Sequence, residues 1–157
     1  MKRNKRALIL LLIMIVFIIS ACGRTGGIKE IAKSSGIDLG RGKEISFEDT
    51  HGGFHGDGCT FAKIGFEDSS LTEDLEKNRE WKKLPLSDNL NTFIYGGYDS
   101  KLEIPEIKEG YYYFKDRHSE SEDVRDDSEL MSRASFNFTL LIYDSETDIM
   151  YIIEYDT

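Results

Sequence analysis

The sequence predicts a single small α+β domain, built mainly on an antiparallel β-sheet of about five to six strands with two short helices. Six segments show the alternating or aromatic-rich pattern of strands, whereas two show helix-boundary signals. These elements do not alternate regularly as β-α-β units, which favours an antiparallel sheet over a parallel one. The clearest element is a hairpin of two apolar segments around the polar turn from Asp144 to Asp148.

A short first helix is expected from Ile28 to Ser35. Gly36 follows it, and glycine readily adopts the left-handed conformation that ends many helices. Ile37 would then fold back onto Ile31 or Ala32, as in a Schellman motif. The helix is therefore predicted to end at Gly36.

A hairpin is expected next, with strands from Lys43 to Asp49 and from Cys59 to Glu67 joined by the loop Thr50 to Gly58. Apolar residues alternate in both segments, so one face of each strand is predicted to turn toward the core. Those residues are Ile45 and Phe47 in the first strand and Ala62, Ile64 and Phe66 in the second.

The second helix is expected to open at Ser70-Leu71-Thr72-Glu73, which has the Ser-x-x-Glu pattern of a capping box. It would carry Leu71, Leu75 and Trp81 to the core, and Pro85 would stop it.

The C-terminal half is expected to be mainly β. The predicted strands run from Thr92 to Tyr98, from Gly110 to Lys115, from Ser135 to Tyr143 and from Ile149 to Tyr155. In the third of these strands, one side is apolar and consists of Phe136, Phe138, Leu140 and Ile142.

The N-terminus has the pattern of a secretory signal. Basic residues precede an uninterrupted apolar segment of 13 residues from Ala7 to Ile19. Ordinary signal cleavage after Ala21 would leave the bulky Ile19 where a small residue is expected. The sequence Ile19-Ser20-Ala21-Cys22 instead resembles the lipobox of bacterial lipoproteins. The uncharged stretch from Ala7 to Gly23 has 17 residues, the lower limit for a spanning helix, so an uncleaved anchor is the alternative.

The resemblance implies that residues 1–21 are a signal peptide that is removed. Cys22 would carry a diacylglycerol group, with or without a further N-acyl chain. Residues 22–27 would be the lipidated cysteine and a short tether, and residues 28–157 the globular domain. Two acyl chains hold a protein stably at a membrane, so the expected location is the extracytoplasmic face of the cell membrane.

The mature chain would be strongly acidic. The full sequence has 20 Lys and Arg against 29 Asp and Glu, and residues 1–21 contain four of the basic residues and no acidic one, so the mature charge would be −13. Nucleic acid is a poor partner for such a chain, because its binding depends on basic side chains. Anionic lipid would repel it as well. Membrane attachment is therefore expected to come from the lipid anchor.

The most unusual internal segment runs from Asp49 to Cys59 and contains two of the three histidines and four glycines. One interpretation is a ligand-binding loop, because exposed loops on a rigid sheet often carry recognition. Its residues would be His51, Phe54, His55 and Asp57, with Phe54 as an apolar anchor. A plain glycine-rich hairpin connection, with Cys59 as a small core residue, is another interpretation.

A metal site is the third interpretation of this segment, with Zn²⁺ as the candidate ion. Its ligands would be His51, His55, Asp57 and Cys59. The glycines disfavour a helix that would align these residues, and no established paired zinc-ligand motif is present.

Two other regions could form surfaces. The segment Asp116 to Arg133 holds seven acidic residues but lacks the spacing of an EF-hand, so it is interpreted as a solvated loop with a helix start at Asp126. The three consecutive tyrosines at positions 111–113 alternate in direction, so at least one is expected to face solvent and to be able to stack on a sugar or a peptide.

The sequence contains no catalytic constellation, so we assign no catalytic residue. It favours a membrane-anchored envelope lipoprotein that acts as a binding or interaction module, with an envelope protein or a small ligand as partner. A metal-dependent envelope enzyme or metal-binding protein that uses the 49–59 loop is the alternative. The region from Lys43 to Thr157 also resembles small uncharacterised lipoproteins of Gram-positive bacteria, around Asp49 to Gly58 and Gly110 to Ser119. That resemblance implies a recurring domain and no particular activity.

Overall fold

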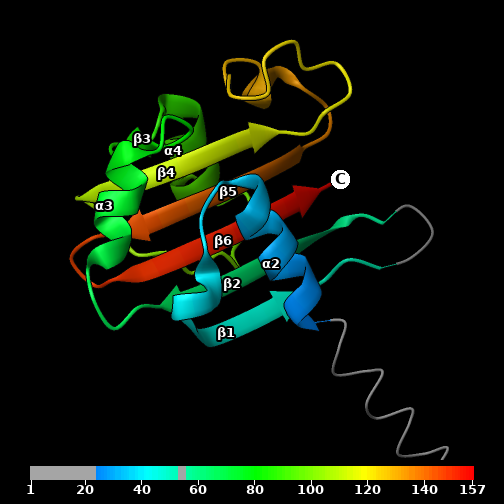
Figure 1. Ribbon diagram of the computed structural model, residues 1–157. Helices are drawn as coiled ribbons and strands as arrows, with labels where there is room; N and C mark the ends of the chain where they lie inside the picture. Colours follow the sequence, from blue (N-terminus) through cyan, green and yellow to red (C-terminus); the bar gives the residue numbers. More distant parts are fainter. Residues whose placement is uncertain (1–23, 53–55) are drawn as a thin grey trace, which may run out of the picture.

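The protein folds around one antiparallel sheet of six strands in the order β1-β2-β6-β5-β4-β3 (Figure 1). The computed structural model describes residues 24–52 and 56–157. The strands are β1 (Lys43–Asp49), β2 (Gly58–Gly65), β3 (Lys82–Lys83), β4 (Gly110–Asp116), β5 (Asn137–Asp144) and β6 (Ile149–Asp156). The helices are α2 (Arg24–Ser34), α3 (Ser70–Lys77) and α4 (Asp88–Tyr95), with short 3-10 turns η1 (Leu39–Arg41) and η2 (Leu130–Ser132). The predicted small α+β domain is confirmed.

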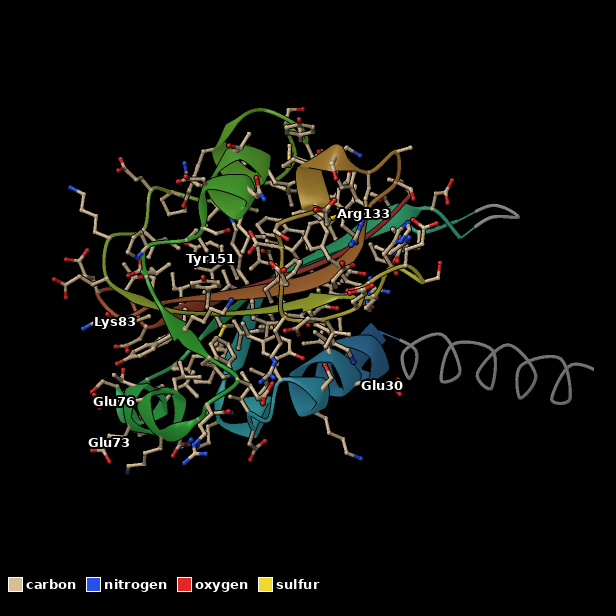
Figure 2. The ribbon with its side chains drawn as sticks, turned by 90° about the horizontal axis from the view of Figure 1, so that it is seen from above. Glu30, Glu73, Glu76, Lys83, Arg133 and Tyr151 are labelled. Carbon is tan, nitrogen blue, oxygen red and sulfur yellow. The ribbon has the colours of Figure 1, made fainter. Side chains whose placement is uncertain are left out.

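Helices cover both faces of the sheet, so the domain has three layers. Figure 2 shows the sheet nearly edge-on, with α4 on one side and α2 and α3 on the other. On the first side is the α4 core, which includes Cys59, Phe61, Leu90, Phe93, Phe138, Leu140, Tyr151 and Ile153. On the second side is the α2–α3 core, which includes Ile31, Ala62, Leu71, Leu75, Trp81, Tyr113, Leu141, Tyr143 and Ile152.

The predicted C-terminal hairpin is confirmed as the centre of the sheet. β5 pairs with β6 over eight residues, from Asn137 opposite Asp156 to Asp144 opposite Ile149. Four consecutive residues of β5, at positions 140–143, have no exposed surface. Consecutive strand residues point to opposite faces, so this run is buried only because both faces are covered.

The end of α2 has the predicted Schellman geometry. Gly36 has φ of 73°, its N–H donates to the C=O of Lys33, and the N–H of Ile37 donates to the C=O of Ala32. The start differs from the prediction, because the helix begins at Arg24 and includes residues 24–27 that were expected in the tether. Within the described part of the chain, none of the helices combines the length and apolar character needed to cross a membrane.

The β1–β2 hairpin also forms as predicted, with one correction at Ile45. The register shifts between Glu44 and Ser46, so Ile45 is the extra residue of a bulge. Phe47 packs against the α2–α3 core as expected, but the Ile45 side chain is 57% exposed. β1 is an edge strand, and a bulge with flanking charges protects such an edge from pairing with another chain.

The predicted capping box of α3 is wrong in its detail. The helix begins at Ser70, but its N-cap residue is Ser69, which makes no side-chain hydrogen bond. The carboxylate of Asp68 accepts from the Ser70 N–H at 3.0 Å instead. Leu71 and Leu75 are buried as expected, whereas the helix ends at Lys77, before the buried Trp81.

The strand predicted from Thr92 to Tyr98 is wrong, because most of this segment belongs to α4. Ser87 caps the helix and accepts from the Leu90 N–H. The helix buries Leu90, Phe93 and Ile94, whose spacing of three and four residues is typical of one helix face. The sixth strand is the short β3, which pairs with β4 through Lys82 and Lys83.

The three tyrosines at the start of β4 are less exposed than expected. Tyr112 lies in the α4 core and Tyr113 in the α2–α3 core, and Tyr111 packs against the latter. Because both faces of the sheet are covered, Tyr112 and Tyr113 are buried and Tyr111 is only partly exposed. Tyr95 and Tyr98 are exposed instead.

Candidate functional site

One end of the sheet carries polar side chains where the same face is apolar further along the strands. The α2–α3 core uses Ala62 in β2, Tyr113 in β4, Leu141 in β5 and Ile152 in β6. Two residues further along each strand, the side chain points to the same face. Those positions hold Thr60, Lys115, Thr139 and Glu154, so the face changes from apolar to polar.

The strand register arranges these side chains in two rows, which we call the polar ledge. The first row consists of Asp49, Thr60, Glu154, Thr139 and Lys115, each paired with the next across β1, β2, β6, β5 and β4. The second row, one step nearer the sheet end, consists of His51, Asp156, Asn137 and Arg117. Asn137 is opposite Asp156, and its C=O accepts from the Arg117 N–H at 2.7 Å. The ledge therefore joins residues of five strands, between positions 49 and 156 of the sequence.

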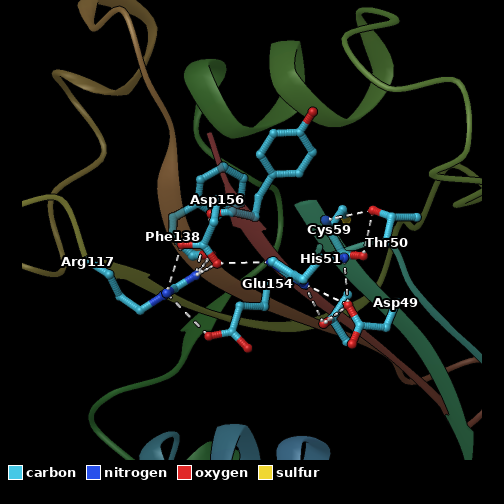
Figure 3. Close-up of polar contacts among 10 residues, drawn as sticks. Asp49, Thr50, His51, Cys59, Arg117, Phe138, Glu154 and Asp156 are labelled. Atoms are coloured by element: carbon cyan, nitrogen blue, oxygen red, sulfur yellow. Dashed lines mark hydrogen bonds and ion pairs between the residues drawn. The ribbon is translucent and has the colours of Figure 1, made fainter. Parts of the chain in front are cut away.

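His51 is held between two carboxylates at this end of the sheet (Figure 3). Its Nδ1 lies 2.7 Å from Asp49 Oδ1 and its Nε2 lies 3.1 Å from Asp156 Oδ2. Ionised carboxylates only accept hydrogen bonds, so the ring donates to both when both its nitrogens are protonated and to one otherwise. His51 thereby fastens the beginning of the 50–57 loop to the C-terminal strand.

The surroundings of Asp49 clearly shift the pKa of its carboxyl group. Burial acts to raise the pKa of its carboxyl group, but hydrogen bonds from the His51 N–H, the His51 ring and Thr60 outweigh burial and lower the pKa below its usual value. Asp49 is therefore a carboxylate at neutral pH, and it orients His51.

Arg117 closes the other side of the ledge. One guanidinium nitrogen lies 3.0 Å from Asp156 Oδ1 and 3.3 Å from Glu154 Oε1. The other donates to the C=O of Phe138 at 3.1 Å and to Asp156 Oδ2 at 3.0 Å (Figure 3). Such shared, charge-assisted hydrogen bonds fix the positions of both carboxylates.

A groove of about 240 Å³ lies between α2 and the ledge. Glu30, Ile31 and Ser34 of α2 form one wall, and the other wall consists of Lys115, Arg117, Thr139 and Glu154. The groove thus offers hydroxyl groups and side chains of both charges. A polar ligand or peptide side chain could hydrogen-bond to these groups, whereas an apolar ligand would leave them without partners.

Of the two predicted loop residues that the structure describes, His51 and Asp57, only His51 belongs to this ledge. Asp57 is exposed, with its C=O accepting from the Gly52 N–H at 3.4 Å. Phe54 and His55 lie outside the described residues, as does the predicted lipid-attachment residue Cys22.

The fourth residue of the predicted metal set points away from His51. Cys59 is buried in the α4 core beside Phe61, whereas its neighbour Thr60 contacts His51 from the opposite face. Burial, reinforced by the charge of Asp99, raises the pKa of the Cys59 thiol to about 12. The part of the chain that the structure describes contains no group of three residues placed to hold a metal ion, and the metal hypothesis stays a prediction.

The acidic segment after β4 is held in place by its own charges. Asp116 is buried and pairs with Arg133, and the N–H of Asp116 donates to the C=O of Val124 at 2.7 Å. Asp126 accepts from the Ser128 N–H at 2.9 Å, but only the 3-10 turn η2 follows, in place of the expected helix. Most residues from 119 to 129 are exposed, so the segment is a solvated loop that is attached to the same end of the sheet.

Sequence reasoning missed most of the ledge, in particular Arg117, Glu154 and Asp156. A usable signal was present in β5, where the side of the strand opposite Phe138 and Leu140 changes from Leu141 to the polar Thr139. That change marks where the apolar α2–α3 core ends. Arg117 had no such signal, because it belongs to the site only through pairing between β4 and β5.

Comparison of the chain with protein-family models, with curated proteins and with solved structures gave no match.

Proposed function

We propose that this protein is a lipid-anchored lipoprotein of the cell envelope that binds a polar partner through the ledge. The anchor part of the proposal is supported by the basic, apolar and Ile19-Ser20-Ala21-Cys22 pattern of the first 22 residues. The binding part is supported by the ledge itself. The ledge consists of two rows of polar side chains on a sheet face that is otherwise packed with apolar ones.

The single observation that carries the binding part is the groove between α2 and the ledge. Thr139 and Thr60 are almost fully buried. Arg117 orients Glu154 and Asp156 beside them through ion pairs. A surface that only needed to be soluble would gain nothing from ordering its charges in this way, because ordering a long side chain costs conformational entropy. Ordered donors and acceptors beside a groove favour recognition of a polar group.

Replacing Cys22 with alanine is expected to abolish acylation of the protein. Cys22 would provide the sulfur atom for the diacylglycerol group, and a serine or alanine there has no thiol to acylate. Cells that express the wild type should incorporate labelled fatty acid into this chain, and the Cys22→Ala variant should incorporate none. Normal labelling of the variant would contradict the anchor.

A photo-crosslinking residue at position 115 is expected to capture the partner in intact cells. Lys115 lies in the wall of the groove, whereas Lys83 lies in the short β3 and is exposed (Figure 2). Replacing either lysine removes the same charge, so position 83 is the matched control. A discrete product at 115 that is absent at 83 is the expected result. Equal products at both positions, or none at 115, would count against the ledge.

A further inference from the structure

We propose that the lipid anchor turns the ledge end of the sheet toward the membrane, so that the surface at this end meets the headgroup layer of the bilayer. This inference rests on the anchor of the proposed function. Its subject is the orientation of the folded domain, which the anchor by itself does not determine.

The chain between the anchor and the fold is short. α2 begins at Arg24, two residues after Cys22. Two residues span at most about 7 Å even when fully extended. The start of α2 must therefore lie close to the glycerol and headgroup region, and the domain cannot rotate freely on a long tether.

The contacts of α2 show its direction across the sheet. Its last residue, Ser34, accepts from the Tyr113 hydroxyl at 3.2 Å, near the middle of β4. One turn earlier, Glu30 lines the groove with Lys115 and Arg117, which lie toward the end of β4. The helix therefore runs back from the centre of the sheet toward the ledge, and Arg24 lies roughly 9 Å before Glu30 at 1.5 Å per residue.

Five strands begin or end at the ledge end of the molecule. In the antiparallel order, β1, β4 and β6 all finish there, and β2 and β5 begin there. The start of α2, the end of β1, the chain end and the segment that follows β4 all lie at this end of the molecule (Figure 1). The β5–β6 turn is at the opposite end, and a strand of eight residues spans roughly 26 Å.

The sheet order also separates the anchor from the most acidic segment. α2 starts on the β1 side of the sheet (Figure 1), whereas the acidic residues of positions 120–129 follow β4, which is separated from β1 by three strands. Since anionic lipid repels carboxylates, this arrangement favours contact through the β1 corner. The groove of the ledge is then held within reach of the headgroup layer.

Fluorescent labels on two introduced cysteines test this orientation. Asp57→Cys lies at the ledge end and Glu146→Cys lies in the β5–β6 turn; both positions are exposed, and each change removes one carboxylate. Cys22 is acylated, and Cys59 is buried with its pKa raised to about 12, so neither should react with the label at neutral pH. In liposomes that contain a headgroup-linked nitroxide quencher, the label at 57 should be quenched several-fold more strongly than the label at 146.

A spacer variant is the matched control. A flexible Gly/Ser insertion of about 20 residues between Gly23 and Arg24 would span about 25 Å on average, and it should make the quenching of the two labels similar. Equal quenching at the native spacing, or stronger quenching at 146, would overturn the orientation while fatty-acid labelling of Cys22 still supported the anchor. Absence of that labelling would overturn the anchor and the orientation together.

Discussion

Replacing Arg133 with methionine is expected to lower the free energy of unfolding by about 3–5 kcal/mol, the usual effect of breaking one half of a buried ion pair. The Asp116 side chain is 3% exposed and the Arg133 side chain is 14% exposed, so water cannot replace the lost guanidinium. Asp116 would keep the 2.9 Å hydrogen bond from the His118 N–H, but its other oxygen would lose its charged donor. Urea titration of the detergent-solubilised protein, followed by the fluorescence of the single tryptophan, measures the change.

The double variant Asp116→Asn with Arg133→Met is the control for this prediction. Removing both charges avoids leaving a buried carboxylate unpaired, so the double variant should recover most of the stability lost by Arg133→Met alone. If Arg133→Met lowered the free energy of unfolding by less than about 1 kcal/mol, the pair would behave as a surface ion pair. The attachment of the acidic segment to the sheet would then depend on other contacts.

Replacing Phe93 with alanine is expected to lower the free energy of unfolding by about 3–5 kcal/mol. Phe93 has no exposed surface, and its ring lies 4.9 Å from Phe138, 5.1 Å from Tyr155 and 5.2 Å from Phe136, all edge to face. Removing it leaves a cavity between α4 and the ends of β5 and β6, and it removes the favourable contacts of the aromatic rings. The same urea titration measures the loss.

Ile94 and Tyr95 provide matched controls that distinguish a helix from a strand at this place. In α4, Phe93 and Ile94 are both buried and Tyr95 is exposed, so Ile94→Ala should be clearly destabilising and Tyr95→Ala only slightly. In a strand, Phe93 and Tyr95 would share a face, and Ile94 would point to the other. A large effect of Tyr95→Ala with a small effect of Ile94→Ala would contradict the helix.

The wrong strand at Thr92–Tyr98 shows how local signals compete. Thr92, Phe93, Ile94 and Tyr95 are β-branched or aromatic residues, which favour strands. The helix forms because Ser87 caps it and because Leu90, Phe93 and Ile94 together fill one side of the α4 core. Burial of three large side chains outweighs the small difference in propensity.

The site was predictable only in part, for a similar reason. His51 stood out because it lies in an unusual glycine-rich segment. Its partners did not: Asp156 is 105 residues away in the chain, and Arg117 reaches Asp156 across β5. No local pattern connects these residues, because their proximity depends on the strand order.

The sequence by itself determined the elements whose signal is local. These are the Schellman end of α2 at Gly36, the hairpin of β5 and β6, the β1–β2 pairing and the burial of Leu71 and Leu75. Each depends on backbone preferences or on side-chain periodicity within about a dozen residues. The Cys22 motif is local as well, and it remains a prediction of the sequence.

The tertiary structure alone decided which surfaces exist. Covering both faces of the sheet buried Tyr112 and Tyr113 and left Tyr111 only partly exposed. Beyond the apolar side chains of the α2–α3 core, the polar positions of five strands lie together as a ledge beside α2. Hydrophobic burial places the helices where the apolar side chains are, and the polar residues beyond them become neighbours only after the strands have paired.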